Sequence, residues 1–175
     1  MVDGVISFLS ILTLIANIVI LLFLFLKKFR DYVITIANKY GLVFAYIVSI
    51  IATLGSLFLS EVAHFTPCLL CWYQRILMYP QAIILLVALF MKFTKEIKYY
   101  CIALSGVGFV LAIYHYYLQL FGNPAIPCST VGISESCATR PFTHFGYITI
   151  PFMAATAFLL IILSMLFTAK IQSKG

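Results

Sequence analysis

Five long apolar stretches constrain what this chain can fold into more than any other feature of its sequence. They cover about residues 5–26, 41–60, 72–91, 100–121 and 146–169. Each has roughly the 20 apolar residues with which a helix crosses a bilayer, and the connections between them are short. Because helices satisfy their own backbone hydrogen bonds in lipid, we expect an all-α integral membrane helical bundle in a cell membrane.

The charged residues indicate how such a bundle is oriented. Only 9% of the 175 residues are charged, against about 25% in soluble domains. With five crossings, nine of the 11 Lys and Arg residues fall on one side, namely Lys27, Lys28, Arg30, Lys39, Lys92, Lys95, Lys98, Lys170 and Lys174. Positive residues gather on the cytoplasmic side, which predicts an outer N-terminus and a cytoplasmic C-terminus. The charges are topology signals in short loops, so we expect no nucleic acid as a partner. Since the basic cluster follows the first stretch, we expect a retained helix rather than a signal peptide.

The cysteines are sorted by this topology. Cys68, Cys71, Cys128 and Cys137 fall on the outer, extracytoplasmic side, and Cys101 is expected to be a buried apolar residue. Disulfides persist in oxidising compartments. Four cysteines allow three connectivities, and local spacing favours Cys68–Cys71 and Cys128–Cys137. The second pair suits a structural staple as well as a redox pair. A bridge across two residues restrains little chain, so the first pair suits thiol exchange better.

The run "TPCLLCWYQRILMYP", residues 66–80, places a cation beside the first pair. Cys71 lies at the start of the third stretch, where the positive end of a helix favours a thiolate. Arg75 follows by four residues and therefore lies on the same helical face. An arginine at membrane depth needs a partner, which here is the thiolate or a polar ligand, unless the side chain snorkels to the interface.

The fourth stretch contributes a second polar group at comparable depth. His115 and Gln119 are separated by four residues and share a helical face, level with Gln74 and Arg75. A histidine in a membrane span is a candidate functional residue, with a core histidine bonded to a neighbour as the alternative.

Together these groups predict a redox site at the membrane surface. Thiolates attack disulfides through mixed intermediates, so two dithiol pairs can pass oxidation from one to the other. A lipid-soluble two-electron carrier, a quinone, fits the pair at the membrane. Arg75 and His115 would stabilise the negative charge that develops on its oxygens.

A metal site is the competing use of the same cysteines. Four thiolates can hold zinc, but zinc sites more often combine two Cys-x-x-Cys units than the spacing found here. A c-type haem needs a histidine directly after the second cysteine, and residue 72 is Trp. We therefore expect no metal.

Three stretches carry a resemblance to a known family. "PCLLCWYQRILMYP", "YHYYLQL" and "FGYITIPFMA" resemble the disulfide-bond-formation protein B (DsbB) family, and look closest to its Gram-positive, BdbC-like branch. The resemblance covers roughly residues 42 to 169 and implies a four-helix, DsbB-like core. On this basis residues 41–175 form the thiol oxidoreductase core. Residues 1–40 form an additional N-terminal transmembrane helix and a basic cytoplasmic loop.

The resemblance also implies an activity. Such proteins are protein-disulfide oxidoreductases that reoxidise a soluble thioredoxin-like dithiol oxidase (DsbA- or BdbD-like) and pass electrons to menaquinone or ubiquinone, which supports protein folding. Cys68 and Cys71 match the membrane-proximal pair, with Cys71 next to the quinone. Cys128 matches the site of the mixed disulfide with the partner, and Cys137 the cysteine that resolves it onto Cys68. The quinone contacts are implied for Arg75 and His115, with Gln74 beside them.

Three alternatives remain open. A vitamin K epoxide reductase-like quinone reductase also combines a helical bundle with Cys-x-x-Cys and loop cysteines. A metal-handling membrane protein would use the cysteines as ligands. A small assembly subunit would use them only as staples.

Overall fold

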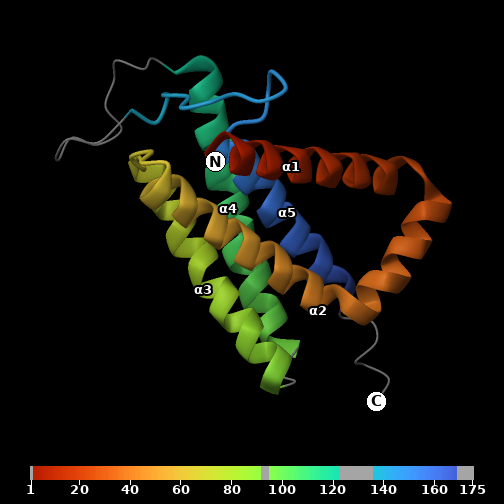
Figure 1. Cartoon of the computed structure of the whole chain (residues 1–175). Helices are drawn as coiled ribbons and strands as arrows, with labels where there is room; N and C mark the ends of the chain where they lie inside the picture. Colours follow the sequence, from red (N-terminus) through yellow and green to blue (C-terminus); the bar gives the residue numbers. More distant parts are fainter. Residues whose placement is uncertain (1, 92–94, 123–135, 169–175) are drawn as a thin grey trace.

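The computed structural model describes residues 2–91, 95–122 and 136–168, and over these ranges it is mainly helical, with no strand. Its long helices are α1 (Val2–Phe25), α2 (Lys27–Leu57), α3 (Leu69–Met91), α4 (Lys95–Phe121) and α5 (Ile150–Thr168) (Figure 1). All five are long and apolar enough to cross a membrane. The predicted membrane helical bundle is thereby confirmed.

The core of the bundle lies between α2, α3, α4 and α5. It is built from Ala45, Met78, Leu85, Cys101, Ala112, Ala155, Phe158, Ile161 and Met165. Cys101 is fully buried in it, as expected for an apolar cysteine. Gly108 of α4 faces the ring of Phe158 in α5 so closely that a Cβ there would collide with it. Small residues allow this close approach, which is how helices associate where lipid supplies no hydrophobic drive.

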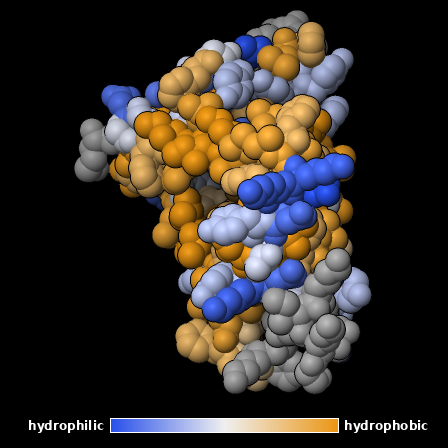
Figure 2. All heavy atoms as spheres, turned by 90° about the vertical axis from the view of Figure 1, so that its right-hand side faces the viewer, coloured by the Kyte–Doolittle hydropathy of each residue, from blue (hydrophilic) through white to orange (hydrophobic). Residues whose placement is uncertain are grey.

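The chain between α1 and α2 differs from the expected loop. Only Leu26 separates the two helices, and residues 27–40 form the first turns of α2. These residues include neither Gly nor Pro, and Lys and Arg are good helix formers. The basic residues therefore stand on a helix. Seen from the side where α1 turns into α2, hydrophilic side chains gather beside a broad hydrophobic surface (Figure 2).

The chain reverses direction between the end of α2 and Cys68. A π-helical turn, η1 (Phe58–Val62), continues α2, and His64 then adopts a left-handed conformation with φ 54°. The Phe65 N–H donates to the carbonyl of Leu59 at 3.0 Å, which closes the helix end. The reversed chain enters α3 directly through Cys68.

Candidate functional site

Cys68 and Cys71 form a close pair of free thiols at the start of α3. Their Sγ atoms lie 3.1 Å apart, within hydrogen-bond distance. The Cys68 carbonyl accepts a hydrogen bond from the Trp72 N–H at 3.1 Å, so Cys68 occupies the N-cap position of α3. Its sulfur also accepts a hydrogen bond from the backbone N–H of Cys71. A thiol thus takes the place that a serine or aspartate side chain usually has at a helix start.

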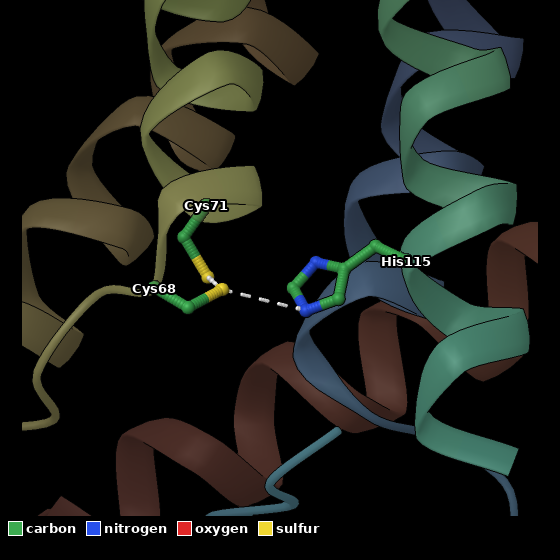
Figure 3. Close-up of side chains that lie close together, drawn as sticks. All are labelled: Cys68, Cys71 and His115. Carbon is green, nitrogen blue, oxygen red and sulfur yellow. Dashed lines mark hydrogen bonds between the residues drawn. The ribbon is translucent and has the colours of Figure 1, made fainter. Parts of the chain in front are cut away.

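His115 reaches this pair from α4 (Figure 3). Its Nε2 lies 3.6 Å from Cys68 Sγ, and its Nδ1 lies 2.9 Å from Nε2 of Gln74. An amide nitrogen only donates, so Nδ1 accepts and the neutral ring carries its hydrogen on Nε2. Both side chains are buried. Gln74 therefore orients His115 so that it presents an N–H to the sulfur of Cys68.

These contacts favour negative charge on the sulfur of Cys68. The pKa of the Cys68 thiol is lowered from its ordinary value, chiefly by the hydrogen bond from the Cys71 thiol. The hydrogen bond from His115 and the Cys71 backbone N–H act in the same direction, and burial opposes them. The sequence alone favours a thiolate at Cys71, because the third apolar stretch begins at residue 72. The helix begins at Leu69, so the donors converge on Cys68 instead.

Arg75 is held by α2. Its Nε donates to Ser56 Oγ at 3.0 Å, and a terminal nitrogen donates to the Ser56 carbonyl at 3.1 Å. The hydroxyl of Tyr79 also donates to Ser56 Oγ, at 3.2 Å. The guanidinium lies 5.5 Å from the centre of the Trp72 ring. The sequence does not predict the roles of Ser56 and Tyr79, since a lone serine in an apolar span gives no signal of its partner.

A cavity of about 480 Å³ opens beside these groups. Its polar lining includes Cys68, Cys71, Gln74, Arg75, His115 and Gln119, and the rest is mostly apolar. The Oε1 atom of Gln119 is buried and has no hydrogen-bond partner among the described residues. The volume lies within the range of small-molecule sites, and such sites combine an apolar lining with a few polar groups.

Cys137 packs into the same region from the segment before α5. It is 2% exposed and shares a buried cluster with Cys68 and Leu70, against which Cys71 and Leu118 pack. Cys137 is disulfide-bonded. The structure thus brings three of the four predicted redox cysteines together, whereas Cys128 lies outside the described residues.

The segment after Cys137 is tied to the end of α4. Gln119 Nε2 donates to the Thr139 carbonyl at 2.9 Å, and Arg140 Nε donates to the Gln119 carbonyl at 2.6 Å. The helical face of Gln119 can be read from the sequence, but the contact of Arg140 with the Gln119 carbonyl cannot. Its capping contact could be found only once the return of the chain to α4 was known.

The thiols and the imidazole also form a group of potential metal ligands. The donor atoms of Cys68, Cys71 and His115 all lie within 4.8 Å of one another. Two thiolates and one imidazole suit zinc, with a fourth position left open. This set differs from the four-cysteine set weighed from the sequence, because it replaces the loop pair with a histidine.

Comparisons with known proteins give one family match and several similar relatives. The family described as "Disulfide bond formation protein DsbB" matches residues 38–168. Disulfide bond formation protein C of Bacillus subtilis is 44% identical over 131 residues, which cover 73% of this chain and 93% of that protein. The SPbeta prophage-derived disulfide bond formation protein B of the same organism is 43% identical, with 66% of this chain and 76% of that protein covered. A probable disulfide formation protein of Coxiella burnetii is 39% identical, with 73% and 86% covered. No solved structure matches the chain significantly.

Proposed function

Because this chain belongs to the DsbB family of disulfide bond formation proteins, we propose that it oxidises a soluble thioredoxin-like dithiol oxidase and delivers the electrons to a membrane quinone. The quinone is of the menaquinone or ubiquinone type. The observation that carries the proposal is the meeting of Cys68, Cys71 and Cys137 beside a mostly apolar cavity that also reaches Arg75 and His115. The cysteines would lie on the extracytoplasmic face, with the N-terminus outside and the C-terminus cytoplasmic.

The exchange balances as a two-electron, two-proton transfer. The dithiol of the partner becomes a disulfide while the Cys128–Cys137 disulfide is reduced. The reduced loop pair then reduces a Cys68–Cys71 disulfide and is itself reoxidised. Because Cys137 is 2% exposed, the first attack by a soluble partner is expected at Cys128. Cys137 would then be the sulfur that reaches Cys68, with which it shares a buried cluster.

The hydrogen bonds at Cys68 suit the second exchange. When the Cys137–Cys68 mixed disulfide is resolved by Cys128, Cys68 departs as a thiolate. A leaving thiol of lower pKa departs faster. The N–H of His115, fixed by Gln74, and the N-cap position both stabilise that charge.

The cavity fits a quinone. When bound, a quinone accepts the two electrons and two protons released as Cys68 and Cys71 close their disulfide. Arg75 would hold a carbonyl oxygen through a guanidinium already fixed by Ser56. The Nε2 atom of His115 would remain within hydrogen-bond distance of the Cys68 sulfur as that sulfur loses its proton. The unpaired Oε1 of Gln119 offers an acceptor for a hydroxyl hydrogen.

The test is a reconstituted assay with the purified protein in lipid nanodiscs. A reduced thioredoxin-like partner should be oxidised over many turnovers only when quinone is supplied. Cys71→Ser should abolish turnover, and Cys137→Ser should trap a covalent complex through Cys128. Unchanged multiple turnover in the absence of both quinone and oxygen would overturn the proposal.

Metal handling is the second candidate, and the grouping of Cys68, Cys71 and His115 favours it. Zinc titration of the reduced protein decides between the two. One tightly held zinc per chain, combined with no quinone-dependent turnover, would favour metal handling. No tight zinc binding, combined with quinone-dependent turnover, would favour the redox function.

A further inference from the structure

We propose that α1 forms a wall of the binding site for the apolar chain of the quinone, and that α1 thereby sets which chain is accepted. This inference rests on the proposed function. The family match begins at residue 38, so α1 is not part of the matched region. None of the residues in the main core cluster comes from α1.

α1 is attached to the bundle by one narrow side. Its buried residues are Ile6, Ser10 and Thr13. Further along, Asn17 Nδ2 donates to Thr156 Oγ1 of α5 at 3.2 Å. Since α1 crosses the bundle next to α5 (Figure 1), this bond fixes α1 against α5.

The residues that α1 turns toward the cavity follow a helical repeat. They are Leu9, Leu12, Thr13, Ile15, Ala16 and Val19. Positions three and four apart lie on one face, so most of this set forms a single stripe. From Leu9 to Val19 the stripe extends about 15 Å along the helix axis at ~1.5 Å per residue. Apart from the hydroxyl of Thr13, which donates to the Leu9 carbonyl at 2.9 Å, the stripe is apolar.

The opposite walls come from α2 and α5, and they are apolar as well. Phe44, Ile47, Val48 and Ile51 line the cavity from α2, and Ala154, Ala157 and Leu160 line it from α5. Without α1 these residues would form an open groove facing lipid. With α1 in place, the cavity combines the polar groups around Cys68 and Arg75 with an extended apolar lining. A ligand with a polar ring and a long hydrocarbon chain matches both parts, whereas a ring alone would use only the polar part.

The experiment fills the α1 stripe without touching the polar groups. In Ala16→Phe, and independently in Val19→Phe, a ring enters the cavity from α1. The matched control is Ile18→Phe, since Ile18 is 47% exposed and does not line the cavity. Each variant is assayed in nanodiscs with two electron acceptors, a menaquinone with a long prenyl chain and the same naphthoquinone ring without a chain. A thermal unfolding transition checks that each variant is folded. If Ala16→Phe does not fold, Val19→Phe tests the inference in its place.

The cavity variants should raise KM for the long-chain quinone about tenfold, which corresponds to about 1.4 kcal/mol. KM for the chainless ring should stay within about twofold, and Ile18→Phe should change neither. A second readout is the long-chain quinone retained on purification, which should fall in the cavity variants and persist in the control. Equal effects on both quinones, no effect on either, or a phospholipid chain retained in place of quinone would overturn the inference. If the unsubstituted protein reduces neither quinone, both the proposed function and the inference about α1 are wrong. If it reduces both quinones and all variants behave like it, only the inference about α1 is wrong.

Discussion

The hydrogen bond from His115 to Cys68 can be tested by removing it. In His115→Leu the Cys68 sulfur loses one of the donors that stabilise its thiolate. Hydrogen bonds to charged groups contribute about 1.5–3 kcal/mol. The Nε2–Sγ distance of 3.6 Å is long, so we take the lower value. At 1.36 kcal/mol per pKa unit this predicts that the pKa of Cys68 rises by about one unit.

The assay follows how fast Cys68 is alkylated as the pH changes. The thiolate is the reactive form. Because folding lowers the pKa of Cys68, the reduced protein should react at lower pH than the unfolded chain does. Short pulses of iodoacetamide at a series of pH values, read by fragment-ion mass spectrometry, separate Cys68 from Cys71. The midpoint for Cys68 should move to higher pH in His115→Leu.

Two further variants make the result specific. Gln74→Leu leaves the imidazole in place but removes the donor to its Nδ1, so we expect a smaller shift in the same direction. His144→Leu changes a histidine whose ring contacts are with Phe142 and Phe145, and it should leave the midpoint unchanged. A midpoint for Cys68 that is the same in His115→Leu as in the unsubstituted protein would refute the reasoning.

Three other outcomes follow from the same structure. Arg75→Ala should raise KM for quinone at least tenfold while KM for the thioredoxin-like partner stays unchanged; an equal rise in both would argue against the placement of the quinone. Gly108→Ala should lower the thermal unfolding midpoint, since overpacking costs about 1–3 kcal/mol and its Cβ would meet the ring of Phe158. Gly106→Ala is the matched control, because nothing lies within 4 Å of a Cβ at that position. Cys101→Ser should leave the rate of partner oxidation unaltered, and a large loss of rate would show that the core cysteine takes part in the exchange.

The sequence predicted the membrane bundle because length and hydropathy alone determine which segments can span lipid. It also put His115 and Gln119 on one helical face, since side chains one turn apart share a face, and it put Gln74 at a comparable depth. The sequence does not predict the contact between His115 and Cys68, because this contact depends on how α3 and α4 pack and on where α3 begins. Local propensity does not locate a helix start that is capped by a cysteine rather than by serine, threonine, aspartate or asparagine.

Other parts of the site depend on tertiary packing and could not be derived from local pattern. Ser56 anchors Arg75 only because α2 passes beside α3 at that level. The role of α1 as a cavity wall depends on its bond to Thr156, far away in the sequence. The roles of the site residues, the orientation of the termini and the division at residue 40 stay predictions, as does the pairing of Cys128.

The burial of Cys137 has a consequence where small thiols are abundant. Cys137 is 2% exposed and does not line the cavity, so a small thiol in solution has little access to its sulfur. In the proposed relay, small thiols would then reduce this sulfur slowly, and electrons would enter through the partner protein. Selectivity for the partner protein would thus arise from the burial of this sulfur rather than from recognition of the partner at each exchange step.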